Sequence, residues 1–299
     1  MPPAARTIEG DPAKPAFVFA PGLGMDSAFW AAPSEARVLG GLYPLGRLYG
    51  EPRLRTLYHD VADLGHRVAT WGPRRPVGPV AEVVAELREV VENTPGAREA
   101  GVVLVGHSRG GLAARMALPG LLDRGFRVMA LVTIASPHRG SSMARWASML
   151  APFAAFVDQF LPAGEKKALS SAVKRALGFL SSPGVRELLP GSELLGSLGE
   201  GKPGALYCLS AGGTDPTLWR GKYFSIPGTF EKILPPGALP AEMTEGRGDC
   251  LVTDQSAALP FADEHLTLHK NHIRIILDSD ARGEVLKKVM RLVQGGGRR

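Results

Sequence analysis

Short runs of apolar residues, each followed by a helix-like segment, are the feature that most limits how this chain can fold. Residues 101–106, GVVLVG, are a continuous apolar run, which is typical of a strand buried on both faces of a sheet. Residues 79–92, just before it, carry apolar side chains at helical spacing with charged ones opposite. Similar patterns predict strands at 16–20, 66–71, 128–136 and 205–211, and helices at 112–118 and 281–293. This alternation predicts an α/β fold, with a mostly parallel doubly wound sheet and helices on both faces.

The composition fits a single domain over residues 1–299 with one sizeable core. The chain is 44% hydrophobic and 21% charged, as in ordinary globular proteins. Its net charge of +6 comes from scattered Lys and Arg rather than a basic stripe with aromatic residues, so we expect no nucleic-acid partner. The two cysteines, Cys208 and Cys250, exclude a disulfide-rich scaffold, and we expect two buried thiols rather than one disulfide.

The sequence shows neither a signal peptide nor a membrane-spanning run. Residues 1–15 lack the apolar region of a signal peptide, and no apolar run reaches the length of a membrane span. These features predict a cytoplasmic protein, although a secreted chain without its leader would look the same. The sequence carries no signal for the oligomeric state.

Residues 106–110, Gly-His-Ser-Arg-Gly, place a serine between a predicted buried strand and a predicted helix. The chain has 37 glycines, so a G-x-S-x-G match carries little weight by itself. Its position between strand and helix is the context that a nucleophile elbow requires. Side chains at either flanking glycine would collide with the neighbouring strand and helix. We therefore predict that Ser108 projects its hydroxyl at the carboxyl edge of the sheet, where doubly wound folds bind ligands.

A nucleophilic serine needs a histidine as its base and an acid that orients the histidine, and after such an elbow the acid comes before the base. His265 and His269 flank Leu-Thr-Leu, which looks like the final strand. His272 follows that strand by a short loop, which places it to reach over the edge of the sheet. We predict His272 as the base, with His269 as the alternative.

The acid is expected in a loop at the same edge. Asp249 lies 23 residues before His272, and we predict it as the acid, with Asp254 and Asp215 as alternatives. A metal site built from the three histidines near the end is not favoured, because the chain has no H-E-x-x-H motif and no cysteine close to them.

Two backbone amides should stabilise the oxyanion that forms when a serine attacks a carbonyl group. One is the amide of Arg109, the residue after the nucleophile. The other should come from residues 20–24, APGLG, which follow the first buried strand. Pro21 has no N–H, and Gly22 permits close approach of the backbone, so the amide of Leu23 is the predicted second donor.

Four sequence blocks, in order between residues 17 and 273, resemble those of bacterial true lipases and lipase-like carboxylesterases of the α/β-hydrolase superfamily. VFAPGLG resembles their oxyanion loop, VGHSRGG their elbow, and ASPHRGS a block after the next strand. GDCLVTDQSA followed by NHIRI resembles their Asp-Gly-x-Val and Asn-His segments. The resemblance implies the α/β-hydrolase fold, a triad of Ser108, Asp249 and His272, and an oxyanion hole lined by Leu23 and Arg109. It also implies a structural role for His138.

Three positions depart from the pattern of that family. Pro21 stands where His usually precedes the glycine, and Cys250 replaces the usual glycine after the acid. Arg274 stands two residues after His272, where many of these lipases have an aspartate near a calcium ion. We therefore expect no metal ion and no cofactor.

Residues 141–198, between two predicted strands, are too long for a plain crossover and fit a helical cap. Large apolar residues at helical spacing face one way in its first part, and Trp146, Leu150 and Phe153 are the candidates for lining a substrate. Two interpretations stay open: a mobile lid that opens at a lipid surface, or two amphipathic helices packed permanently on the core.

Together these features predict a serine-dependent carboxylic ester hydrolase, a lipase or esterase, that acts on lipophilic acyl esters such as triacylglycerols. The expected partners are the small-molecule or lipid ester and a lipid–water interface. Two alternatives use the same residues differently. An acyltransferase would pass the acyl group to an alcohol other than water, and product analysis would distinguish it. A hydrolase-like binding protein without catalysis would not react with a fluorophosphonate.

Overall fold

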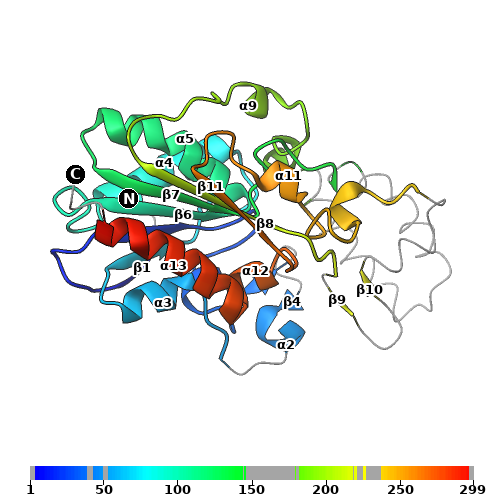
Figure 1. Ribbon diagram of the computed structural model, residues 1–299, viewed down its shortest axis with the longest axis horizontal. Coiled ribbons are helices and arrows are strands. Elements are labelled where there is room, and N and C mark those ends of the chain that lie inside the picture. The colour runs from blue at the N-terminus through cyan, green and yellow to red at the C-terminus, as the bar shows by residue number, and fades with distance from the viewer. Residues whose placement is uncertain are drawn as a thin grey trace.

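A seven-stranded sheet forms the centre of the computed structural model of the chain, in the order β1-β5-β2-β6-β7-β8-β11 (Figure 1). All neighbouring pairs are parallel except β1 and β5, which are antiparallel. The strands are β1 (Ala5–Ile8), β2 (Ala16–Ala20), β5 (Val68–Trp71), β6 (Val102–His107), β7 (Val128–Ile134), β8 (Tyr207–Gly213) and β11 (Glu264–Leu268).

The structure describes residues 4–38, 43–49, 53–143, 145, 179, 182–217, 219–220, 225–226 and 237–295. Within these ranges, no helix is both long enough and apolar enough to cross a membrane.

Helices cover both faces of the sheet (Figure 1). On one face α4 (Val80–Glu92) packs beside α5 (Arg109–Asp123), and on the other α3 (Leu57–Asp63) contacts α13 (Ser279–Gly295). The predicted mostly parallel sheet with helices on both faces is confirmed. Its order places β2, β6 and β7 in the middle, so the loops after these strands leave from the centre of the carboxyl edge.

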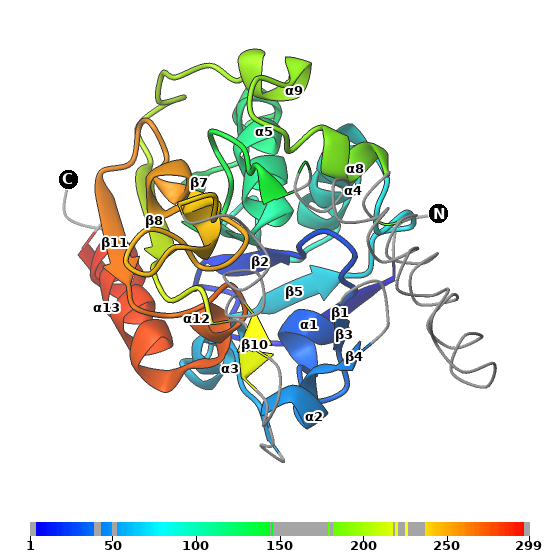
Figure 2. The same cartoon turned by 90° about the vertical axis from the view of Figure 1, so that its right-hand side faces the viewer.

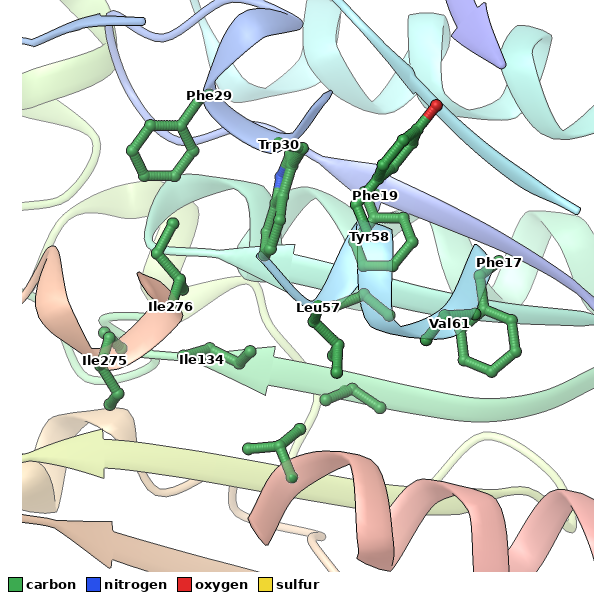
Figure 3. Packing of buried hydrophobic residues seen from close by; sticks show 14 of the residues in the cluster. Phe17, Phe19, Phe29, Trp30, Leu57, Tyr58, Val61, Ile134, Ile275 and Ile276 are labelled. Atoms are coloured by element: carbon green, nitrogen blue, oxygen red, sulfur yellow. The ribbon is translucent and has the colours of Figure 1, made fainter. Parts of the chain in front are cut away.

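Alternation along each strand divides the core into two halves. Phe17 and Phe19 of β2 pack with α3 and α13, whereas Val18 and Ala20 pack with α4 and α5. Successive side chains of a strand point to opposite faces, so a strand covered on both sides needs apolar residues at every position. Figure 3 shows the first half of the core, where Trp30 and Leu57 lie with the two phenylalanines.

Short elements gather at the carboxyl edge, as Figure 2 shows for α1, α8, α12 and β10. Trp30 of α1 donates from its indole Nε1 to the Ala20 carbonyl at 3.1 Å, which holds this helix against the end of β2. The remaining elements are α1 (Ala28–Ala31), β3 (Arg37–Val38), β4 (Tyr43–Pro44), α2 (Leu45–Tyr49), α8 (Pro183–Arg186), α9 (Glu193–Gly196), β9 (Trp219–Arg220), β10 (Ser225–Ile226), the 3₁₀ helix η1 (Ala241–Met243), α11 (Asp254–Ala257) and α12 (Arg274–Leu277).

Candidate active site

The turn around Ser108 has the geometry of a strained elbow. Ser108 directly follows β6 and precedes α5, with φ of 55° and ψ of −127°. A non-glycine residue in such a sparsely populated region costs on the order of 1–3 kcal/mol. A Cβ at Gly106 would lie 2.4 Å from the Gly111 nitrogen, and one at Gly110 would lie 2.3 Å from the Ala20 oxygen. The predicted steric need for both glycines is confirmed, because neither backbone contact could give way.

Ser108 is 9% exposed, and its hydroxyl makes no hydrogen bond to any described residue. Its backbone is fixed, because its N–H donates to the Ile134 carbonyl of β7 at 2.9 Å and its carbonyl accepts from the Gly111 N–H at 3.0 Å. The backbone is therefore held on both sides while the side chain keeps its hydrogen-bonding capacity.

Asp249 and His272 form a buried hydrogen-bonded pair. His272 Nδ1 lies 2.8 Å from Asp249 Oδ2, and the two side chains are 2% and 1% exposed. The His272 N–H also donates to the Asp249 carbonyl, at 2.9 Å. Because a carboxylate only accepts, the proton of this contact belongs to Nδ1, which leaves Nε2 of a neutral imidazole as the free proton acceptor.

A tight turn fixes the Asp249 carboxylate. Gly248 and Thr253 form an antiparallel bridge across the turn. Asp249 Oδ1 accepts from the N–H groups of Leu251 and Val252 at 3.0 and 2.7 Å, which leaves Oδ2 for His272. A side chain on Gly213, at the end of β8, would lie 2.7 Å from the Asp249 Cβ, so this glycine allows the acid to approach the sheet.

The loop that carries His272 is held by Asn271 and by the core. Asn271 Oδ1 accepts from the N–H groups of Ile273 and Arg274 at 3.1 and 2.8 Å, and its Nδ2 donates to the Thr217 carbonyl at 2.8 Å. Ile275 and Ile276 of α12 belong to the core cluster that also contains Phe29 and Trp30 of α1 (Figure 3). The helix after His272 is therefore anchored in the core.

The alternative residues have other partners. Asp254 accepts from His265 Nε2 at 3.0 Å and from the Thr267 hydroxyl at 2.9 Å, and His265 Nδ1 lies 2.8 Å from Ser210 Oγ. Asp215 Oδ1 accepts from the Thr217 N–H at 2.8 Å. Of the three candidate acids, only Asp249 contacts His272 within the described residues.

His269, the alternative base, points into solvent. Its side chain is 69% exposed and lies 3.5 Å from Glu245. His265, His269 and His272 thus contact three different carboxylates. Among the residues with described positions, no three His, Cys, Asp or Glu side chains come together as a metal site.

The two predicted oxyanion donors both have unused amides. Leu23 lies in the loop after β2, and neither its N–H nor that of Arg109 donates to a described residue. For Arg109 the reason is that it is the first residue of α5, whose first-turn N–H groups have no acceptor within the helix. The loop around Leu23 is tied down by the Gly24 N–H, which donates to the Pro76 carbonyl at 2.8 Å.

The side chain of Arg109 has no exposed surface, and no sequence pattern predicts this burial. Its Nη1 donates to the Gly78 carbonyl at 3.0 Å, whereas Nε and Nη2 are buried and have no partner among the described residues. Burial lowers the pKa of Arg109 to about 10, against the opposing effect of Glu187, Glu86 and Glu82. Position 109 therefore carries a buried cation whose donors are only partly satisfied.

His107, the residue before Ser108, was also missed by sequence reasoning. Its Nε2 lies 2.8 Å from the His272 carbonyl oxygen, and the two imidazole centroids are 4.7 Å apart. Burial, and then the nearby His272, lower the pKa of His107 well below 6.5. The only sequence signal for this residue is its place inside the elbow motif.

Both cysteines are free and buried, as predicted. Burial raises the pKa of each thiol to about 12. Cys250, directly after Asp249, has φ of 86°, in the left-handed region that favours glycine. This is the position where the family pattern has glycine, so the turn keeps the glycine-like conformation although the residue has changed.

His138 has structural contacts. It is 4% exposed, its Nε2 lies 3.0 Å from Thr133 Oγ1, and its N–H donates to the Ser256 carbonyl at 2.9 Å. These contacts tie the segment after β7 to α11 and agree with the structural role that the resemblance implied.

The described end of the predicted cap packs on the loop that carries Leu23. A Cβ at Gly184 of α8 would lie 2.7 Å from the Leu23 Cδ1, and one at Gly24 would lie 2.8 Å from the Phe179 ring. Trp146, Leu150 and Phe153 lie outside the described residues, as does most of 141–198, so the substrate-lining role and the lid stay predictions.

Comparisons with known proteins agree with this architecture. The sequence model described as the alpha/beta hydrolase family matches residues 17–193, more than half of the chain. A search of curated proteins finds no match.

Several solved structures share the fold. The mature form of the Bacillus licheniformis lipase BlEst2 is 20% identical, with a TM-score of 0.58, and the match covers 97% of this chain and 99% of that one. A Staphylococcus hyicus lipase is 15% identical, with a TM-score of 0.59, and the match covers 96% and 99%. A metagenomic carboxyl esterase is 20% identical, with a TM-score of 0.50, and the match covers 97% and 78%. At these identities the likeness concerns the fold. With the matching family model, it leads to one conclusion: this chain belongs to the alpha/beta hydrolase family.

Proposed function

We propose that the chain is a serine-dependent carboxylic ester hydrolase that forms an acyl-enzyme on Ser108. The observation that carries the proposal is the buried Asp249–His272 pair, which lies against the residue that precedes the strained Ser108. A nucleophile, a base and an orienting acid are the three groups that acyl transfer through serine requires. Two of the similar structures are lipases and one is a carboxyl esterase. We therefore propose that the substrate of this chain is also an ester.

The first half of the reaction transfers the acyl group to the protein. Ser108 Oγ attacks the carbonyl carbon of the ester while His272 Nε2 takes the hydroxyl proton. Asp249 accepts from Nδ1–H and stabilises the resulting imidazolium. The N–H groups of Leu23 and Arg109 donate to the oxyanion. When the intermediate collapses, the bond to the alcohol oxygen breaks, and the alcohol leaves with the proton from Nε2.

The second half releases the acid. Water attacks the acyl carbon, His272 Nε2 takes a proton from the water, and the same two amides donate to the second oxyanion. Collapse breaks the bond to Ser108 Oγ, which recovers its proton from His272, and the carboxylic acid leaves. A hydrogen bond from Ser108 to His272 has to form or shorten when the ester binds, as is common for catalytic contacts in free enzymes.

Lipophilic acyl esters such as triacylglycerols are the proposed substrates, with Trp146, Leu150 and Phe153 of the cap lining the acyl chain. The apolar character of these side chains supports this choice. Hydrolysis of p-nitrophenyl esters from short to long chain measures the preference. If emulsified long-chain triglyceride is cleaved no better than a dissolved short-chain ester, opening of a cap at a lipid surface is excluded.

A fluorophosphonate probe tests the nucleophile directly. Trypsin cleaves after Arg98 and Arg109, so Ser108 is the only serine in the peptide 99–109, and an adduct on that peptide identifies it. We expect the wild type and Ser210→Ala to be labelled there and Ser108→Ala to be unlabelled. Ser210 is the matched control because it too contacts a histidine that is paired with an aspartate. Absence of label from active wild type would contradict the proposal.

A further inference from the structure

His107 lies between the two loops that the proposed reaction brings together. It continues the row of Val103 and Val105 on one face of β6, and its side chain has no exposed surface. Its ring centroid lies 5.2 Å from that of Phe29 and 6.5 Å from that of Trp30. A methyl group on Gly22, in the loop before Leu23, would lie 3.3 Å from His107 Nδ1. The imidazole therefore fills the space between the oxyanion loop, α1 and the loop of His272.

The contact between His107 and His272 is directional. A carbonyl oxygen only accepts, so the 2.8 Å contact requires that His107 Nε2 carry the proton and donate it to the His272 carbonyl. His272 is then held at three atoms: its N–H and its Nδ1 by Asp249, and its carbonyl by His107. Asp249 sets the orientation of the ring, and His107 fixes the backbone from which the ring projects.

The same contact joins the base to the nucleophile. His107 and Ser108 are consecutive, so a backbone shift of His272 away from His107 is also a shift away from the serine. A neutral His107 adds no positive charge beside the imidazolium that His272 becomes during the reaction. A donor that is buried, neutral and covalently attached to the nucleophile is well suited to hold the distance between the two reacting side chains.

We propose that His107 is a positioning residue that sets the distance between Ser108 and His272 through its hydrogen bond to the His272 carbonyl. The proposal rests on the proposed function, because it takes Ser108 as the nucleophile and His272 as the base. It predicts that the donor at Nε2 matters for the reaction, rather than the volume of the imidazole ring.

Two substitutions separate the donor from the volume. His107→Leu fills much of the space but has no donor, whereas the side-chain amide of His107→Gln can donate from near the position of Nε2. His66→Leu is the matched control. His66 is 3% exposed, its Nδ1 lies 2.8 Å from the Pro15 carbonyl oxygen, and its ring packs edge-on against Phe17. It is thus a buried histidine of the same kind in another part of the core.

Steady-state hydrolysis of p-nitrophenyl butyrate gives kcat and KM, and the melting temperature gives stability. We expect His107→Leu to lower kcat by about 10²-fold with KM changed by less than about 3-fold, because a displacement near 1 Å of reacting groups has an effect of that size. We expect His107→Gln to recover most of this loss. His66→Leu should lower the melting temperature and leave kcat unchanged. Wild-type kcat in His107→Leu, equal losses in both His107 variants, or an equal loss in His66→Leu would overturn the proposal.

Proton NMR of protein with ¹⁵N-labelled histidine tests the positioning without relying on turnover. The resonance of His272 Nδ1–H, assigned by its loss in His272→Gln, should be sharp in wild type and His107→Gln and broadened by exchange in His107→Leu. An unchanged resonance in His107→Leu would overturn the role of His107. If wild-type protein neither reacts with a fluorophosphonate nor cleaves the ester, the proposed function fails instead, and this resonance alone decides whether His107 positions His272.

Discussion

The Asp249 carboxylate accepts a hydrogen bond from His272 Nδ1 at 2.8 Å, and almost no surface of either side chain reaches solvent. A second pair, Asp254 and His265, has nearly the same contact at 3.0 Å, but about a quarter of each side chain is exposed. His265 also contacts Ser210, so the described residues hold a Ser, His and Asp grouping besides the proposed triad. The second is a poor candidate for catalysis, because Ser210 is fully buried within β8, whereas Ser108 lies at the edge of the sheet.

The two pairs give a matched comparison. Replacing Asp249 by Asn should lower kcat for p-nitrophenyl butyrate by about 10⁴-fold, because the amide favours the wrong tautomer of the histidine. Asp254→Asn removes the same charge from the other pair and should leave kcat within about 3-fold of wild type, as expected for a contact outside the reacting groups. The reverse pattern would assign the reaction to the second grouping.

Arg109 should act through its backbone rather than its side chain. Arg109→Met keeps the amide and a similar volume but removes a buried guanidinium, two of whose nitrogens have no partner in the described part of the chain. Replacing an incompletely paired buried charge with an apolar residue is often neutral or stabilising. We expect kcat within about 3-fold of wild type, since the oxyanion donor remains. We also expect that the free energy of unfolding, measured by urea titration, is not lowered. A 10²-fold loss of kcat, the size typical for a removed oxyanion donor, would show that the guanidinium takes part in the reaction.

The buried histidines should make the protein less stable in acid. Burial lowers the pKa of His107 and of His138 well below 6.5, so the folded chain holds both neutral while the unfolded chain protonates them. The unfolded state then binds more protons below pH 6.5, and the free energy of unfolding falls as the pH falls. Each such group should cost about 2 kcal/mol between pH 7.5 and pH 5.0.

His138→Gln isolates one of these contributions, because His138 contacts Thr133 and lies outside the proposed reaction. Urea titrations at pH 7.5 and 5.0 should show a smaller loss of stability in acid for this variant than for wild type, by about 2 kcal/mol. The same loss in both proteins would mean that His138 does not hold a lowered pKa.

The buried strands of the central sheet could be predicted because apolar residues dominate them on both faces, without the regular polar alternation of a half-exposed strand. Residues 102–107 and 128–134 are examples, and their predicted ranges differ from the observed ones by at most two residues. β1 (Ala5–Ile8) was missed, since all four of its residues are exposed and leave no apolar pattern. α5 is longer than predicted, beginning at Arg109 and ending at Asp123. Gly110 and Gly111 are poor helix formers, but their close packing on Ala20 and Ser136 keeps them in the helix.

The order of the chain predicted which residues meet at the carboxyl edge, but not how they are held. Asp249 lies in the turn before α11 and Asp254 is the first residue of that helix, and sequence spacing could not exclude either. The structure distinguishes them, because the Asp249 carboxylate contacts His272 and the Asp254 carboxylate contacts His265. The contact between His107 and His272 joins residues 165 positions apart through a backbone carbonyl, which has no side-chain signature in the sequence.

The most direct test of the central claim compares wild type, Ser108→Ala and Ser210→Ala in the hydrolysis of p-nitrophenyl butyrate. Loss of the nucleophile should lower kcat by about 10⁶-fold, close to the limit of detection, with the melting temperature retained. Ser210→Ala should keep wild-type kcat, because its hydroxyl contacts His265, which is not part of the proposed triad. An active wild type whose kcat is unchanged in Ser108→Ala would contradict the account.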